Sequence, residues 1–417
     1  MTTTAERALD AGHLAGTTGY RRVVVALMAG GLANFAVMYF VQPLLPLLVT
    51  EYGVSASDSA HALSITTATI IIGLLAAGPL SDRIGRVRLM RWSLIASGAF
   101  GLASAFASSW AALLTLRGLL GVTLAWFPAA ALAYLREEIH PASHTKANAA
   151  YIAGTGVGGA AGRLLPGPLA ALGGWTLAAA VISLLTLAAG VALWLLLPPS
   201  SGFEPRPVSL RDVVLGTVTA PSDTVIAGLC AAGFAAMGAF VGIYNAAAFR
   251  LQAPPFSLGH AASLVYLAYP LGIAGPTLLR RLSDRIGRGY ATVVGTIVLG
   301  LAVVVVSAGA LAGVVAGLSL LTFGFLGTHA MLSGWVVDRA QRQGRGTAQA
   351  SSAYLITYYL GSTIAGALAT WLWQGTGWGG VEVLAGALVL ACVGAVALSA
   401  RADRNPTVTL EDEASLA

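Results

Sequence analysis

Long apolar runs separated by short polar segments repeat along the 417-residue chain. Each run is close to the ~20 residues at which a helix, rising about 1.5 Å per residue, crosses the hydrocarbon core of a bilayer. Backbone amides must be paired inside lipid, and barrel strands need only about 10 alternating residues, so runs this long predict helices. We expect an all-α membrane protein with twelve transmembrane helices, at residues 22–49, 60–80, 92–108, 110–135, 146–170, 175–197, 223–249, 260–280, 290–308, 311–336, 348–373 and 378–400.

A long polar interruption, rich in Pro and Ser, divides six predicted helices from six. The phrase LSDRIGR occurs at residues 80–86 and recurs unchanged at residues 282–288, in corresponding loops of the two halves. Such repetition indicates a duplicated unit, and two parallel repeats of six spans are a known transporter arrangement. The predicted organisation is a tail, a six-helix half, a linker, a second six-helix half and a tail, at residues 1–21, 22–197, 198–222, 223–400 and 401–417.

Composition and charge fit a membrane protein. Apolar residues make up 57 % of the chain and charged residues 10 %, against roughly 45–50 % and about 25 % in soluble domains. All but three of the 23 Lys and Arg residues fall in segments that face one side, the exceptions being Arg117, Arg163 and Arg250. By the positive-inside rule both termini face the cytoplasm. The net charge of +6 is then a topology signal, and no nucleic-acid partner is expected. We expect a monomer in the lipid bilayer of a bacterial inner membrane.

The two ends of the chain are polar. The first twenty or so residues contain no apolar segment of the signal-peptide kind, so the first span is expected to act as its own insertion signal. We expect this tail, and the acidic segment after Arg404, to be disordered. Cys230 and Cys392 lie inside apolar runs, where we interpret them as small packing residues.

The stretch GPLSDRIGRVRLMR at residues 78–91 resembles the loop signature of the major facilitator superfamily, and it lies in the loop where that family carries it. The number of spans and the half-chain repeat extend the resemblance over nearly the whole length. The YnfM-like branch, near the arabinose-efflux permeases and drug:proton antiporters, is similar in the segments YFVQPLLPLL, LRGLLG, PAAALAYLREEI, YIAGTGVGGAAGRLLPG and FGFLGTHAMLSGWV. The resemblance implies a secondary active transporter that exports a small organic molecule by alternating access, driven by inward proton flow.

The residues of this loop have separate physical roles. Gly78 lets a neighbouring helix approach closely, Gly85 permits a tight turn, and Asp82 can face an arginine or the positive end of a helix. The resemblance implies that the cluster latches the halves on the cytoplasmic side when the transporter opens outward; a basic loop that only sets topology is the alternative. Arg280 and Arg281 replace the Gly-Pro pair in the second copy, which predicts a weaker latch there. The predicted gating residues are Gly78, Asp82, Arg83, Gly85, Arg86, Asp284, Arg285, Gly287 and Arg288.

Two arginines lie inside predicted spans, where charge is costly and function is the default interpretation. Arg117 and Arg163 are each about eight residues from the outer end of their helix, so they share a depth. They can pair with an anionic substrate, or be satisfied by backbone carbonyls in a structural role. The resemblance associates Arg117 with proton coupling, because it matches the family's arginine in span four. Drug:proton antiporters of this superfamily often carry a buried carboxylate in an N-terminal span, but here no Asp or Glu lies well inside a span and span one offers Asn34 instead. Arg163 is a further departure, an addition to the glycine-rich segment of span five, and it weakens the drug-antiporter interpretation.

His329 is the one histidine well inside a span, where its titration range suits a proton relay, although hydrogen-bonded packing is the alternative. In the fold that the resemblance implies, helices of both halves line a central cavity. Polar and aromatic side chains are expected to meet there, or else to anchor helix ends at the membrane interface. The predicted substrate and ion site comprises Asn34, Tyr39, Gln42, Arg117, Trp126, Arg163, Tyr244, Asn245, His329 and Tyr358.

Other functions have little support in the sequence. It contains no G-x-x-x-x-G-K-[ST] loop for ATP, no metal-ligand cluster and no nucleophile at a plausible spacing from a base. We therefore expect neither an enzyme nor a cofactor. The alternatives are a proton-independent facilitator or an organic-anion exchanger built around Arg117 and Arg163, and a non-transporting membrane sensor, against which the intact loop signature argues.

Overall fold

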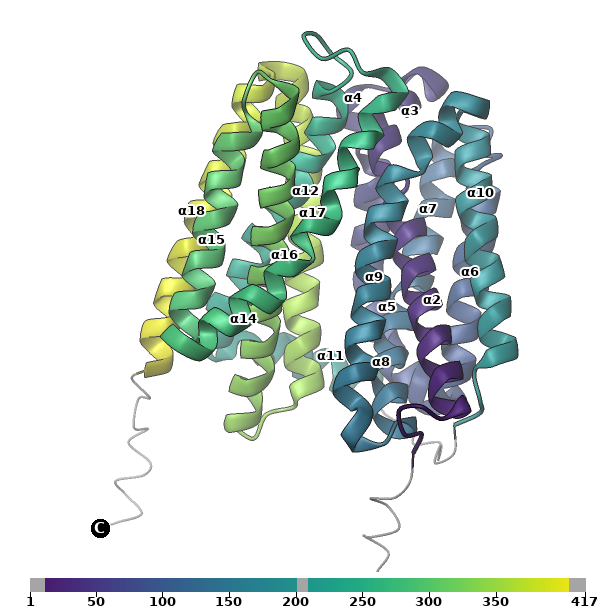
Figure 1. Ribbon diagram of the computed structural model, residues 1–417, viewed down its shortest axis with the longest axis vertical. Coiled ribbons are helices and arrows are strands. Elements are labelled where there is room, and N and C mark those ends of the chain that lie inside the picture. The colour runs from purple at the N-terminus through teal and green to yellow at the C-terminus, as the bar shows by residue number, and fades with distance from the viewer. Residues whose placement is uncertain (1–11, 201–208, 405–417) are drawn as a thin grey trace, which may run out of the picture.

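The computed structural model describes residues 12–200 and 209–404 as two helical bundles that stand side by side (Figure 1). The first bundle comprises α2 (Thr18–Tyr39), η1 (Gln42–Leu44), α3 (Leu45–Tyr52), α4 (Ala56–Ser59), α5 (His61–Ile84), α6 (Arg86–Ser104), α7 (Trp110–Leu124), α8 (Trp126–Glu138), η2 (Pro141–Ser143), α9 (His144–Leu164) and α10 (Pro166–Leu196). After a linker with α11 (Leu210–Thr219) and η3 (Ala220–Ser222), the second bundle comprises α12 (Thr224–Arg250), η4 (Gly259–Ala268), α13 (Tyr269–Gly272), α14 (Ala274–Ile286), α15 (Arg288–Val306), α16 (Leu311–Arg342), α17 (Thr347–Thr376) and α18 (Trp378–Arg404). The start of α2 and the end of α18 lie at the same end of the molecule, the cytoplasmic end.

All twelve predicted spans correspond to helices of the structure. Ten described segments are long and apolar enough to cross a membrane by composition alone. The other two spans are α6, which begins with three arginines, and the glycine-rich α9. The predicted joint between spans five and six is also present, because Gly173 and Gly174 interrupt α10 with non-helical backbone (φ −159° and 65°).

The structure differs from the predicted boundaries at the N-terminus and in the linker. α2 begins at Thr18 because the side chain of Thr17 accepts a hydrogen bond from the Tyr20 amide, a typical N-cap. His13 donates its amide to the Glu138 carbonyl, so part of the expected disordered tail is bound to the first bundle. The linker contains α11, which contacts both α5 and α17. The remainder of the predicted tail disorder, at residues 1–11 and 405–417, lies outside the described residues.

Glycine turns join the helices at both copies of the repeated loop. Gly85 (φ 91°) ends α5 and Gly287 (φ 85°) ends α14, and a backbone with positive φ favours glycine because it has no Cβ. These turns have the conformation expected of the predicted tight-turn role. Gly78 does not show the predicted close approach, because a Cβ built there meets no atom within 4 Å in this conformation.

A row of glycines brings α9 into direct contact with α2. A Cβ on Gly154, Gly158 or Gly162 would lie 2.5, 2.2 or 2.6 Å from the carbonyl oxygens of Met28, Leu32 and Ala36, respectively. The regular spacing of four residues on both helices means that their backbones touch along three turns. This contact fixes the position of the residue that follows the row, Arg163, against the end of α2.

A polar network holds the cytoplasmic end of the second bundle. Asp223 accepts hydrogen bonds from Arg339 Nη2 (2.8 Å), from Gln343 Nε2 (2.6 Å) and, as the N-cap of α12, from the Ile226 amide (2.9 Å). Arg339 also bonds Asp403 through Nη1 (3.0 Å). Burial alone would raise the pKa of the Asp223 carboxyl, but the bonds from Arg339, Ile226 and Gln343 outweigh it and hold the pKa below its usual range.

We expect Asp223→Asn to destabilise the protein by roughly 1–3 kcal/mol near neutral pH, because the amide is a weaker partner for Arg339. Since the folded-state pKa lies below the unfolded value of about 3.9, the contribution of Asp223 is present above that value and is lost as pH falls through the folded pKa. Thermal unfolding of the detergent-purified protein over a pH series checks this, with the exposed Glu51→Gln as control. An unchanged Tm at neutral pH would contradict the assignment.

Candidate functional site

Hydrogen bonds join the two bundles in the outer part of the molecule. The hydroxyl of Thr67 on α5 bonds the hydroxyl of Thr363 on α17 (2.8 Å), and Ser64 donates to the Thr363 carbonyl (3.2 Å). Nearer the outer surface, the Ser57 amide donates to Gln374 Oε1 (3.1 Å). Within the described ranges, no hydrogen bond or ion pair joins the cytoplasmic ends of the bundles. The described hydrogen bonds across the seam therefore lie on its outer side, and α11 of the linker contacts both bundles at the cytoplasmic end.

Arg163 lies at this seam with part of its guanidinium unsatisfied. Its side chain is fully buried, Nε donates to Gln42 Oε1 (2.6 Å), and Nη1 donates to the Gly159 carbonyl of its own helix (2.9 Å). Nη2 is buried and has no hydrogen-bond partner in the described part of the chain. Arg163 also forms no ion pair with any described carboxylate. The site therefore contains a buried cation that lacks an anion.

Aromatic rings from both bundles surround the Arg163 guanidinium. Its central carbon lies 3.9 Å from the ring centroid of Tyr39 in the first bundle. In the second bundle, the rings of Tyr244 and Tyr269 lie 5.2 Å away and that of Phe240 lies 5.8 Å away. Ring faces attract a cation through their quadrupole, which partly compensates for the missing anion. The same rings present an apolar and planar surface to any molecule that approaches Arg163.

A chain of amides connects Arg163 to the second bundle. Gln42 accepts from Arg163 through Oε1 and donates through Nε2 to Asn245 Oδ1 (2.7 Å). Asn245 in turn donates through Nδ2 to the Gly366 carbonyl of α17 (3.2 Å). Gln42 and Asn245 are fully buried. The relay Arg163–Gln42–Asn245 is thus a polar connection across the seam, inside the closed outer part.

Arg117 has a different environment, although it lies against the same part of span one. It is fully buried, and its Nε, Nη1 and Nη2 donate to the carbonyls of Ala62 (3.0 Å), Val37 (3.2 Å) and Met38 (3.0 Å). Val37 and Met38 belong to the last turn of α2, where carbonyls lack partners within the helix. A cation there also complements the helix dipole. The geometry thus favours the structural alternative for Arg117.

His329 belongs to an aromatic cluster below Arg163. Its Nδ1 is 2.9 Å from the Tyr354 hydroxyl, and its ring centroid is 4.7 Å from that of Tyr358. Phe325 lies 6.1 Å from His329 and stacks on Phe240 at 4.0 Å, which continues the cluster to the rings around Arg163. The structure thus brings six predicted residues together with Arg163 or its cluster, namely Tyr39, Gln42, Tyr244, Asn245, His329 and Tyr358.

The remaining predicted site residues, Asn34 and Trp126, are not part of this cluster. Trp126 packs against the inner hydrophobic core of the first bundle. Asn34 Oδ1 and Trp126 Nε1 are both buried, and neither atom has a hydrogen-bond partner among the residues described. Their predicted role in binding stays a prediction.

The predicted gating residues form contacts within one bundle at a time. Arg86 bonds Asp82 (3.1 Å) and Glu137 (2.7 Å), all in the first bundle. Arg288 pairs with Asp338, both in the second bundle. Three other members, Arg83, Asp284 and Arg285, are exposed. None of these described pairs joins the two bundles, and the latch role of the loop stays a prediction.

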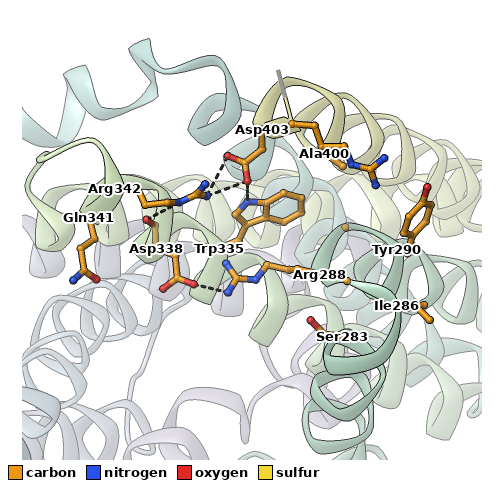
Figure 2. Close-up of a pocket in the computed structure, with 13 residues that line it drawn as sticks. Ser283, Ile286, Arg288, Tyr290, Trp335, Asp338, Gln341, Arg342, Ala400 and Asp403 are labelled. Atoms are coloured by element: carbon orange, nitrogen blue, oxygen red, sulfur yellow. Dashed lines mark hydrogen bonds and ion pairs between the residues drawn. The ribbon is translucent and has the colours of Figure 1, made fainter. Parts of the chain in front are cut away.

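A pocket of about 760 Å³ lies at the cytoplasmic end of the second bundle, away from Arg163. Figure 2 shows that Arg288, Asp338, Arg342 and Asp403 line it with their charged groups paired. Trp335 Nε1 donates to Asp403 Oδ2 (2.9 Å) on the same wall. Because these charges compensate one another, the seam around Arg163 remains the stronger candidate site.

Four residues of the cluster, Phe240, Tyr269, Phe325 and Tyr354, are missing from the predicted site. Three of them lie four residues before a predicted member on the same helix: Phe240 before Tyr244, Phe325 before His329 and Tyr354 before Tyr358. This spacing places both members of each pair on one helix face, which is the signal that points to them.

Two six-helix bundles, joined on one side by a polar seam around a buried cation, define a multi-pass membrane transporter. The sequence profile of the Major Facilitator Superfamily matches residues 27–356, and the chain belongs to this family. The inner membrane transport protein YnfM of Escherichia coli is 36 % identical over 367 residues, which cover 88 % of this chain and 87 % of YnfM. The uncharacterised MFS-type transporter YybF of Bacillus subtilis is 35 % identical over 367 residues, covering 88 % of this chain and 90 % of YybF.

A solved transporter structure has the same fold as this chain. The peptide transporter POT, solved in complex with sulfate, superposes with a TM-score of 0.74 at 13 % identity, over 97 % of this chain and 99 % of POT. The predicted family and the predicted fold of twelve helices in two halves are therefore confirmed.

We expect Arg117→Lys to lower the free energy of unfolding by about 3 kcal/mol, because an ammonium cannot bond three separate carbonyls in this geometry. The Tm of the detergent-purified protein measures the effect. Arg136→Lys is the matched control, since Arg136 is exposed at the end of α8. Equal Tm values for the two variants would show that Arg117 does not hold the end of α2.

Proposed function

We propose that this transporter moves a small organic anion across the bacterial inner membrane by alternating access, with Arg163 as the anion-binding group. The observation that carries the proposal is the unpartnered Nη2 of a fully buried arginine at the seam. A charged side chain inside the membrane costs at least about 2.5–3.5 kcal/mol, so it is retained where it serves a purpose. A carboxylate would offer Arg163 charge-assisted and bidentate hydrogen bonds.

The surroundings of Arg163 support an anion with an apolar, planar body. Tyr39, Tyr244 and Tyr269 come from both bundles, so a ligand that contacts them would bridge the seam. The described helices contribute no carboxylate that pairs with Arg163, so an anionic ligand would meet no like charge there. Arg163 is closed off from water in the present state, which means that the bundles must move to admit a ligand.

Alternating access is supported by the position of the hydrogen bonds between the bundles, which lie on the outer side. The bonds at Thr67, Thr363 and Gln374 close the outer side, while Arg86 and Arg288 pair within their own bundles at the cytoplasmic side. Opening outward would break the first group and allow the loop signature to latch the cytoplasmic ends. Substrate would then reach Arg163 from either side in turn.

Export driven by inward proton flow is the second candidate function, and the environment of His329 favours it. His329 is bonded to Tyr354 in the aromatic cluster that continues to Arg163. An unperturbed imidazole exchanges protons between about pH 5 and 8, and a change in the charge of His329 would alter the cluster next to the anion site. An organic acid leaving the cytoplasm in exchange for a proton would use both groups.

We expect benzoate to raise the Tm of the purified protein, because a ligand that binds the folded state stabilises it. Benzamide has the same shape without the charge and should have no effect. Arg163→Gln should lose the benzoate response, whereas Arg136→Gln, which removes an exposed cation, should keep it. A benzoate response that survives in Arg163→Gln, or its absence in the wild type, would contradict the proposed site.

Proton coupling is tested in proteoliposomes with an imposed pH gradient, where benzoate flux and internal pH are followed together. Coupled transport predicts that benzoate movement changes internal pH, and that His329→Gln removes this change and flattens the dependence of flux on pH. Tyr354→Phe, which keeps the ring and removes the hydroxyl bonded to His329, is the matched variant. Benzoate flux without proton movement in the wild type would exclude the coupled mechanism.

A further inference from the structure

We infer that Gln42 is an internal competitor for the carboxylate of the substrate, and that its displacement from Arg163 couples anion binding to opening of the outer seam. The inference rests on the proposed anion site at Arg163 and adds a residue that transmits binding to the gate. It concerns the relay Arg163–Gln42–Asn245.

The Arg163 guanidinium has one edge that is only half occupied. Nε and Nη2 lie along one edge of the group, which is the edge that accepts a carboxylate with two parallel hydrogen bonds. On Arg163 this edge is half occupied, because Nε donates to Gln42 Oε1 while Nη2 has no partner among the described atoms. Nη1, at the far side, is held by the Gly159 carbonyl and keeps the edge turned toward Gln42.

A substrate carboxylate and Gln42 would compete for this edge of Arg163. A carboxylate that takes both Nε and Nη2 must remove Gln42 Oε1, and the charged acceptor is favoured over the neutral amide oxygen. The carboxylate also supplies the negative charge that the buried cation lacks. Gln42 then loses its partner, and because the pocket is buried its amide must rotate to find another.

Rotation of the Gln42 amide would affect the seam because of where Gln42 lies in the chain. It opens η1, the short element between α2 and α3 in the first span, and Pro43 follows it. Its Nε2 holds Asn245 of the second bundle, which is bonded in turn to α17. Rotation of the Gln42 amide therefore breaks a connection across the seam, so an anion on Arg163 favours the state in which the outer side opens.

The experiment measures outer opening with a cysteine at Ser59, which is fully buried on α4, a helix that contacts α17 across the seam. The native Cys230 and Cys392 are buried. A membrane-impermeant maleimide is applied to the outer face of proteoliposomes that contain Ser59→Cys. Benzoate is expected to raise the labelling rate about tenfold, within the range of typical coupling between sites, and benzamide should leave it unchanged.

Two variants separate coupling from a general loosening of the seam. Gln42→Met removes the relay, so it should label fast without benzoate and show little further increase with it. Gln374→Met removes another hydrogen bond across the seam without touching Arg163, so it should keep the benzoate-induced increase. A full benzoate response in Gln42→Met would overturn the coupling role.

Gln42→Glu provides a second and nearly isosteric test, which also covers a failure of Gln42→Met to fold. The new carboxylate would occupy the Nε and Nη2 edge of Arg163 permanently. The benzoate affinity obtained from the Tm shifts should therefore fall by about tenfold or more. A wild-type affinity in Gln42→Glu would overturn the inference. If benzoate instead gives no Arg163-dependent shift in the wild-type protein, the proposed anion site itself has failed, which distinguishes the two outcomes.

Discussion

The close contact between α9 and α2 determines the rest of the seam. Gly154, Gly158 and Gly162 remove the side chains that would hold the two backbones apart. The next residue, Arg163, is therefore pressed against the end of α2, where its guanidinium contacts Tyr39 and Gln42. A larger residue in the glycine row would move the cation away from the seam, and the polar relay to the second bundle would lose its starting point.

Two buried arginines at one depth show how local backbone decides the role of a charge. The break in span one after Tyr39 frees the carbonyls that Arg117 bonds, so this cation is satisfied by the fold itself. Arg163 donates to one helix carbonyl and one amide oxygen and is surrounded by several rings. Its Nη2 donor is left without a partner among the described residues. The first arginine stabilises the helix break, and the second is suited to bind something that the chain does not supply.

Much of the fold follows from the sequence, because span length, the repeated loop and the distribution of arginines are properties of single residues and their spacing. The joint at Gly173 and Gly174 is equally local. The roles of Arg117 and Arg163 could not be separated in this way, since they depend on carbonyls freed elsewhere and on rings contributed by the other bundle. Gly78 shows a related limit: its open surroundings depend on where the neighbouring helices lie, which the local sequence does not specify.

The helix in the linker has a mechanical consequence. α11 touches α5 in one bundle and α17 in the other, and these are also the helices that meet across the closed outer side. The alternating access proposed above would require α5 and α17 to pivot against each other while α11 bears on both. A ten-residue helix, α11, is thus placed to act as a brace between the two bundles during the proposed movement.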